Sequence, residues 1–446
     1  MVNNLTEGKP LKLLFFFAMP MVVGNLFQQL YNMVDSMVVG RFVGEDALAA
    51  VGSSFPVVFL SVAIAAGLSM GCTVVISQFF GAGKILEMKI TVSTALISLG
   101  VIGLIIMGIG EIIAGPLLTL LGTDPDIMAD SLAYLRIYFG GAVFLFLYNS
   151  LNGIYNALGD SQTPLKFLMV SALTNIVLDL LFVIQFNMGV AGVAWATLIA
   201  QGMCAVFSFF VLIARLRKME NEEAAKGKSF TFFDMSSAER IAKVGVPSIV
   251  SISMMLMQGL VNSYGKVFVA GYTAATKIDT LAMMPNMNFS NAMSSYAAQN
   301  IGARKMDRVK QGYKASMFMV VVFSLIITSI IFLFGPQLLG LFLKQGAEGS
   351  AMSYGLSYMK TVSVFYILMG ALFVSNGLLR GAGDMGAFML SSVVNLFSRV
   401  AIAYLLAHFI GASAIWWSIP TGWAVGALFS FLRVRSGKWM ARRLVD

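Results

Sequence analysis

PMVVGNLFQQLYNMVDSMVVG, residues Pro20 to Gly40, is an apolar stretch long enough to cross a bilayer as a helix, which takes about 20 residues. Four polar residues interrupt it at spacings that place them on one helical face: Asn25, Gln28, Asn32 and Asp35. A carboxylate inside a membrane span is costly unless it faces a protein interior or a water-filled cavity. The stretch therefore predicts a transporter helix, kinked at Pro20, in which Asp35 binds a cation or a proton.

The composition of the whole chain agrees with a membrane protein. Of its 446 residues, 58% are hydrophobic and only 11% are charged, against about 25% charged in soluble domains. A single histidine, His408, and two cysteines within apolar runs, Cys72 and Cys204, give no metal-ligand cluster and no nucleophile motif. We expect an all-α integral membrane protein that is not an enzyme and needs no cofactor.

Hydrophobic stretches predict twelve membrane spans. They cover residues 13–39, 47–79, 90–114, 129–156, 165–186, 190–214, 242–268, 273–300, 313–334, 352–379, 387–408 and 413–432. Most of the 30 Lys and Arg residues fall on one set of loops, which by the positive-inside rule places both termini in the cytoplasm. The basic tail RVRSGKWMARRLVD, residues 433–446, is interpreted as a contact with lipid headgroups and not with nucleic acid.

The two halves of the chain repeat one another. SQFFGAGKILEMK after the second span matches AAQNIGARKMDRVK after the eighth, and NGIYNALGD after the fourth matches NGLLRGAGD after the tenth. Pro20 and Pro247 mark equivalent points where we expect helix kinks. Six spans per repeat predict two pseudo-symmetric six-helix bundles with a central cavity. The predicted domains are an N-terminal bundle (1–214), a cytoplasmic linker (215–241) and a C-terminal bundle with the basic tail (242–446).

Further polar residues in the first half accompany Asp35. Asp179 is a second carboxylate within a span, Asn175 precedes it by one helical turn, and the next span carries Thr197 and Gln201. Two nearby carboxylates in a low-dielectric setting can hold a proton, and the same oxygens are ligands that alkali cations prefer. Both Na⁺ and H⁺ therefore remain open as the coupling ion. Polar residues that we expect to line the substrate cavity are Gln28, Asn32, Asn152, Gln201, Gln258, Asn262 and Arg399.

The second half differs at the matching positions. Asp35 aligns with Asn262, Asn175 with Asn395 and Asp179 with Arg399, so the repeat keeps an asparagine and reverses a charge. We therefore expect a single coupling site, in the N-terminal bundle. For Asp279, in the eighth span, we expect a structural pairing with Lys277 or Arg399.

These motifs together resemble the multidrug and toxic compound extrusion (MATE) family, from about Leu11 to Leu432. The resemblance rests on QQLYNMVDSMVVGRFVGEDALAAVG, the two repeated loops, NALGD and RGAGD, NIVLD in the fifth span and GYTAATKIDTLAMMP in the eighth. It implies a V-shaped pair of six-helix bundles and export of amphipathic, often cationic compounds, driven by Na⁺ or H⁺ entry. It also implies a cation or proton site made of Asp35, Asn175, Asp179 and Thr197, with Asn152 in the same cavity and Pro20 at the bend of the first helix.

Three other functions would require other features of the sequence. A flippase for a lipid-linked oligosaccharide precursor, from the same wider superfamily, would use Arg399 for an anionic phosphate. An integral membrane enzyme lacks a motif, and a major-facilitator transporter would carry a different loop after the second span, where GAGKILEMK stands. We expect a monomer in the inner membrane that acts on small amphipathic molecules and contacts membrane lipid.

Overall fold

A computed structural model describes residues 4–219, 229–246, 261, 264, 266–342, 349–441 and 444 of the chain. Almost all of these residues are helical, and none of them forms a β-strand. Within this described part, eight helices are long and apolar enough to cross a membrane, and two further spans are each made of two helices joined at a bend. The prediction of an all-α membrane fold is confirmed.

The chain divides into two compact units. Unit 1 contains residues 1–4 and 23–249, and unit 2 contains residues 5–22 and 250–446. The first helix, α1 (Pro10–Val38), therefore contributes its beginning to unit 2 and its remainder to unit 1. Its beginning is tied to unit 2 by the preceding segment, where Asn300 Nδ2 donates to Leu5 O (3.1 Å) and Lys305 Nζ donates to Thr6 O (3.1 Å). The domain limits expected from the sequence, at residues 214 and 242, stay a prediction.

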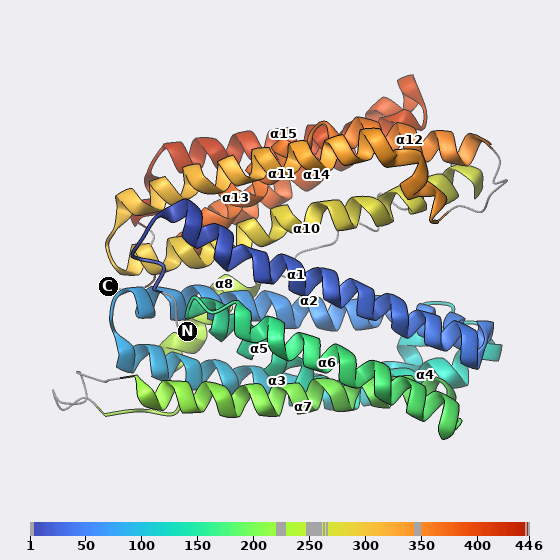
Figure 1. Cartoon of the computed structure of the whole chain (residues 1–446), viewed down its shortest axis with the longest axis horizontal. Coiled ribbons are helices and arrows are strands. Elements are labelled where there is room, and N and C mark those ends of the chain that lie inside the picture. Colours follow the sequence, from blue (N-terminus) through green and yellow to red (C-terminus); the bar gives the residue numbers. More distant parts are fainter. Residues whose placement is uncertain are drawn as a thin grey trace. The chain divides into compact units, whose positions relative to one another are not determined.

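Unit 1 is a bundle of long helices that run beside one another, with α5 packed on α2, α3 and α7, and α6 packed on α7 (Figure 1). Its elements after α1 are η1 (Val39–Val43), α2 (Glu45–Gly81), α3 (Ile85–Leu120), α4 (Pro125–Gly140), α5 (Ala142–Ala157), α6 (Gln162–Leu180), η2 (Leu181–Gln185), α7 (Gly189–Lys218) and α8 (Met235–Gly245). The short π-helices η1 and η2 extend α1 and α6 by about one turn each.

Unit 2 repeats the plan, with α13 packed on α10, α11 and α15, and α14 packed on α15. Its elements after the start of α1 are α10 (Lys266–Gly302), α11 (Met306–Gly340), α12 (Gly349–Ser363), α13 (Tyr366–Ala382), α14 (Met385–Ile410), α15 (Ser413–Arg435) and the 3₁₀ turn η5 (Lys438–Ala441). Its centre holds a group of large buried rings that we call the aromatic core of unit 2: Phe268, Tyr272, Tyr358, Tyr366, Trp416 and Trp423.

Two predicted spans are each divided between two observed helices, and the seventh lies mostly outside the described part of the chain. The fourth is bent by 51° between α4 and α5, and the tenth by 53° between α12 and α13. In the fourth, Gly141 at the bend also lets the chain approach Leu198, since an added Cβ would lie 2.9 Å from that side chain. The seventh span was expected to begin at residue 242, but residues 242–245 belong to α8. Most of its remaining residues, including Pro247, Gln258 and Asn262, lie outside the described part of the chain.

The internal repeat is confirmed by backbone geometry. After α2, the amide of Lys84 donates to Phe79 O (3.1 Å), and after α10 the amide of Lys305 donates to Asn300 O (2.8 Å) in the same type of turn. The turn needs a residue with positive φ, which is Gly83 in unit 1 (71°) and Arg304 in unit 2 (58°). The left-handed conformation was therefore kept even where glycine, which adopts it at no steric cost, was replaced.

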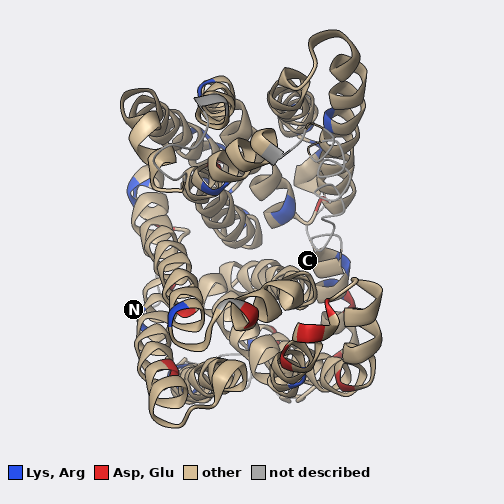
Figure 2. Cartoon of the chain, turned by 90° about the vertical axis from the view of Figure 1, so that its right-hand side faces the viewer, with Lys and Arg blue, Asp and Glu red and all other residues tan. Residues whose placement is uncertain are grey.

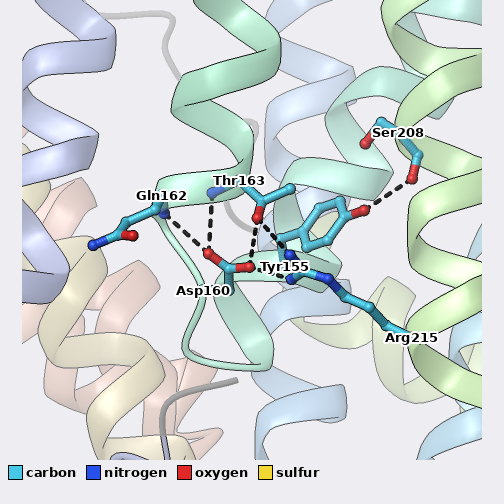
Figure 3. Close-up of polar contacts among 6 residues, drawn as sticks. All are labelled: Tyr155, Asp160, Gln162, Thr163, Ser208 and Arg215. Atoms are coloured by element: carbon cyan, nitrogen blue, oxygen red, sulfur yellow. Dashed lines mark hydrogen bonds and ion pairs between the residues drawn. The ribbon is translucent and has the colours of Figure 1, made fainter. Parts of the chain in front are cut away.

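A buried ion pair also occurs in both units. Figure 2 shows long stretches of helix without Lys, Arg, Asp or Glu, so the few buried charges need partners. Asp160, in the turn between α5 and α6, pairs with Arg215 of α7 and accepts hydrogen bonds from the backbone N and hydroxyl of Thr163 (Figure 3). Asp384, before α14, pairs with Arg433 of α15 (2.7 Å). Each pair ties two consecutive helices of its unit together.

Replacing Arg215 with glutamine is expected to destabilise the protein at pH 7. Removing one member of a buried pair leaves an uncompensated charge. We expect the free energy of unfolding to fall by about 2–3 kcal/mol, which is below the range for fully buried pairs because Arg215 is 28% exposed. Thermal unfolding of the purified protein measures this loss. The exposed pair Lys243–Glu239 provides the control, since Lys243→Gln should leave the unfolding temperature nearly unchanged.

The same pair gives the stability a defined pH dependence. Burial alone would raise the pKa of Asp160, but hydrogen bonds from Thr163 and Arg215 outweigh it, and the pKa lies below its ordinary value of 3.8. A depressed pKa in the folded state contributes stability at pH values above 3.8, and this contribution is lost as the pH falls toward the lowered pKa. The difference in stability between wild type and Arg215→Gln should therefore shrink below about pH 4, and a difference that grew there would contradict this reading.

Candidate ion-coupling site

Two carboxylates of unit 1 come together at the centre of the predicted site. Asp35 lies on the last turn of α1 and Asp179 near the end of α6. Their carboxyl groups are within hydrogen-bonding reach of each other. Asp179 is fully buried, and Asp35 is partly buried. Two acids that contact each other in a low-dielectric environment cannot both be ionised without a large electrostatic cost, so the pair either keeps a proton or needs positive charge beside it.

Asn175 and Thr197 complete the group that the sequence predicted. Asn175 is one turn before Asp179 on α6, and Thr197 lies on the neighbouring helix α7. With the amide of Asn175 oriented so that both of its ends are satisfied, Nδ2 donates to Asp179 Oδ2 (3.0 Å) and Oδ1 accepts from Thr197 Oγ1 (3.2 Å). The structure therefore brings all four predicted residues into one connected cluster.

One oxygen of each carboxylate remains available for a ligand. Asp35 Oδ1 and Asp179 Oδ1 are both buried, and neither has a hydrogen-bond partner among the residues that the structure describes. Buried polar atoms are nearly always paired, so two orphaned acceptors in one cluster indicate a functional position. These atoms could share a proton. Together with the neutral oxygens of Asn175 and Thr197, they could alternatively hold Na⁺.

Two tyrosines of the site were not predicted. The hydroxyl group of Tyr31, on α1, lies 3.4 Å from Thr197 Oγ1, and both Tyr31 and Tyr134 of α4 are close enough to the two carboxylates to interact electrostatically. Tyr31 precedes Asp35 by one helical turn, and that spacing could have identified it. Tyr134 comes from a separate helix, and nothing in its local sequence points to the site.

The predicted cavity residues separate into groups. Gln28 and Gln201 line a small cavity of about 20 Å³ beside Thr197, which is room for one water molecule. Asn32 accepts a hydrogen bond from Gln28 Nε2 (3.3 Å). Asn152 on α5 lies close to the hydroxyl group of Tyr148, which lines the same cavity. Arg399 belongs to unit 2 and is not part of this cluster. Pro20 lies within α1, which stays helical through it.

The expected pairing of Asp279 is not observed. In the described part of the chain, no ion pair joins Asp279 to Lys277 or to Arg399; both of its carboxylate oxygens accept hydrogen bonds from tyrosines instead. Lys277 is exposed, with its Nζ 5.6 Å from the centre of the Phe342 ring. Arg399 is near enough to Asp279 for an electrostatic interaction but does not contact it directly.

A chain of long apolar helices in two repeated units, with a charged pair buried between helices of one unit, is a multi-pass membrane transporter. Its sequence matches the MatE family model over residues 20–181 and 246–405, one match in each repeat. The chain therefore belongs to this family, the MATE transporters, and is a transporter and not an enzyme.

Similar proteins cover nearly the whole chain. The sequence is 31% identical over 453 residues to the Probable multidrug resistance protein YpnP of Bacillus subtilis, covering 99% of this chain and 98% of that protein. It is 21% identical to the Multidrug export protein MepA of Staphylococcus aureus, covering 95% and 93%. Among solved structures, a MATE in complex with MaL6 has 26% identity, a TM-score of 0.89 and 98% coverage of both chains. A MOP superfamily transporter from Pyrococcus furiosus, reported with reverse polarity of its binding pocket, has 25% identity, a TM-score of 0.89 and the same coverage.

Proposed function

We propose that this chain exports small amphipathic, chiefly cationic, organic compounds and draws the energy from entry of Na⁺ or H⁺. The observation that carries the proposal is the pair Asp35 and Asp179, whose carboxyl groups meet inside a membrane bundle with an unpartnered oxygen on each. Relatives that carry the names multidrug resistance protein and multidrug export protein support the substrate class. We place the protein in the inner membrane as a monomer with both termini in the cytoplasm.

The site supplies a simple basis for exchange. When a proton or Na⁺ is bound, the pair carries less negative charge, and Asn175 and Thr197 satisfy the remaining polar atoms. When the ion leaves, the two carboxylates repel each other, and a cationic substrate becomes the alternative source of positive charge. Because the ion and the cationic substrate neutralise the same charge, binding of one opposes binding of the other. Entry of the ion can then be coupled to exit of the substrate.

The coupling ion can be determined with gradients imposed one at a time. Proteoliposomes that contain the purified protein are loaded with ethidium. Efflux of the dye is then followed under one of two conditions: an inward Na⁺ gradient at equal pH, or an inward H⁺ gradient in the absence of Na⁺. We expect one gradient to accelerate efflux over protein-free liposomes and the other to have little effect. If neither gradient changes efflux and the dye still leaves through the protein, the proposal of ion coupling is wrong.

The flippase alternative rests on Arg399, which could hold a lipid-linked phosphate. It predicts that purified protein moves a fluorescent lipid phosphate between leaflets and does not move small cationic dyes. Efflux of ethidium by the purified protein would count against it. The carboxylate pair in unit 1 favours the exporter, because a phosphate-bearing substrate would be repelled by two acids.

A further inference from the structure

A second buried cluster of charged and polar groups lies in unit 2. Asp279 on α10 is 7% exposed, and each of its carboxylate oxygens accepts a hydrogen bond from a tyrosine: Oδ2 from Tyr358 (3.0 Å) and Oδ1 from Tyr366 (2.6 Å). Both tyrosines are almost completely buried. Two hydroxyl donors stabilise the ionised carboxylate. Asp279 is therefore accommodated by the aromatic core of unit 2 without a direct ion pair.

Arg399 on α14 has a guanidinium group that forms no ion pair with any described residue. Arg399 lies close to the hydroxyl group of Tyr272, and among the described residues its Nε is buried without a hydrogen-bond partner. The side chain as a whole is partly exposed, so a ligand can reach it. A guanidinium has five N–H donors in a planar fork, and an arginine at membrane depth is expensive unless these are used. Asp279 does not use them: its oxygens accept hydrogen bonds from two tyrosines, and no ion pair joins it to Arg399 among the described residues.

The surroundings of Arg399 contain two more unsatisfied atoms. Asn395 Oδ1, one turn earlier on α14, and Trp416 Nε1, on α15, are both buried without partners among the described residues. α14 and α15 meet closely here, because an added Cβ on Gly422 would lie 2.8 Å from Asn395 Oδ1. The ring of Trp416 packs 5.8 Å from that of Tyr358, which joins it to the same aromatic core. Charged, polar and aromatic groups are therefore adjacent, as in a site for an amphipathic ligand.

The repeat relates this cluster to the candidate ion-coupling site of unit 1. Asn395 corresponds to Asn175, and Arg399 corresponds to Asp179. Tyr358 corresponds to Tyr134, with an offset of 224 residues. The same offset relates Asn152 to Asn376. The position that carries an acid in unit 1 thus carries a base in unit 2. A site that keeps its place in the fold and reverses its charge should bind a ligand group of the opposite sign.

We propose that unit 2 contains a binding site for an amphipathic oxyanion, in which Arg399 takes the carboxylate or phosphate and the apolar part lies against the neighbouring apolar side chains. The planar fork of arginine matches both groups through two parallel hydrogen bonds. The proposal goes beyond export of cationic compounds, and it does not depend on the carboxylate pair of unit 1. The anionic group could come from a soluble organic acid or phosphate, or from a phospholipid headgroup.

A matched pair of probes tests the site at equilibrium without any ion gradient, so the outcome is independent of coupled efflux. Binding of 1-pyrenebutyrate and of 1-pyrenebutanol to the purified full-length protein is measured by fluorescence titration; the two probes differ in the carboxylate alone. We expect the butyrate to bind roughly 10- to 100-fold more tightly, as charge-assisted hydrogen bonds to one guanidinium allow. Arg399→Gln should abolish this preference, and Arg399→Lys, which keeps the charge, should retain part of it.

Arg136→Gln is the control. Arg136 belongs to unit 1, its side chain is 58% exposed, and its Nε lies 3.8 Å from Glu111 Oε2. This variant should keep the full preference for the butyrate. Competition by phenyl phosphate or by phosphatidylglycerol then identifies whether the anionic group is soluble or lipid-borne. Equal affinity of the wild type for both probes, or an unchanged preference in folded Arg399→Gln, would overturn the proposal. If Arg399→Gln does not purify as a monodisperse protein, Tyr272→Phe takes its place, because this variant leaves every charge intact. Loss of the preference for the butyrate in Tyr272→Phe supports the site, and full retention of the preference counts against the site.

Discussion

Asp179→Asn is expected to reduce ion-driven efflux of ethidium from proteoliposomes to the level of protein-free liposomes. Asparagine has nearly the same shape as aspartate and can still accept the hydrogen bond from Asn175 Nδ2, so the local fold should persist. It cannot, however, carry the negative charge that a proton or Na⁺ neutralises. Asp35→Asn should have the same effect, because the two carboxyl groups contact each other and each orphaned oxygen belongs to the same cluster.

Asp126→Asn is the matched control for this experiment. Asp126 is exposed in the first turn of α4, and its carboxylate is not part of the ion-coupling cluster. This variant should transport as the wild type does. Size-exclusion profiles and unfolding temperatures of all three variants establish that they are folded. If both Asp35→Asn and Asp179→Asn transport at the wild-type rate, the carboxylate pair is not the coupling site.

Gly377→Ala is expected to lower the stability of unit 2 strongly. An added Cβ at Gly377, on α13, would lie 2.3 Å from the backbone oxygen of Ser290 on α10. The obstacle is backbone, which cannot turn aside, so the helices must separate. Separation would also strain the hydrogen bond from Ser290 Oγ to Phe373 O (2.6 Å). We expect a loss of about 3 kcal/mol, at the upper end for overpacking, and a lower unfolding temperature.

The control for this prediction is Gly386→Ala. A Cβ on Gly386, in α14, would meet no atom within 4 Å, and alanine is the better helix former. This variant should unfold at the wild-type temperature or slightly above it. Gly153→Ala should have the same effect in unit 1 that Gly377→Ala has in unit 2. An added Cβ on Gly153 would lie 2.6 Å from the backbone oxygen of Ser69. Wild-type stability of both Gly377→Ala and Gly153→Ala would show that these helix contacts relax easily.

The sequence could predict the fold because bilayer crossing and the repeat both leave strong patterns in it. Long apolar runs mark the helices, and matching loops after α2 and α10 mark the duplication. The bends at the fourth and tenth spans were not predicted, since hydrophobicity continues through Gly141 and through Phe365 without a break. The start of the seventh span stays a prediction, because residues 247–260 lie outside the described part of the chain.

The site could be predicted as far as its charged members. Asp35 and Asp179 are conspicuous because acids within apolar spans are rare, and Asn175 follows from its helical spacing to Asp179. Tyr134 could not be predicted, because which face of α4 turns toward α1 is decided by tertiary packing. The tyrosines that donate hydrogen bonds to Asp279 were missed for the same reason.

The aromatic core of unit 2 has a consequence for optical measurements on the protein. Of the five tryptophans in the chain, Trp195 alone belongs to unit 1, and the other four, Trp416, Trp417, Trp423 and Trp439, belong to unit 2. Trp416, Trp423 and Trp439 are buried. The ring of Trp416 lies close to those of Phe268 and Tyr358, and the ring of Trp423 lies close to that of Tyr366. Intrinsic ultraviolet emission from the unlabelled chain is therefore weighted toward unit 2. Replacing Trp195 with phenylalanine would turn it into a reporter of that unit alone.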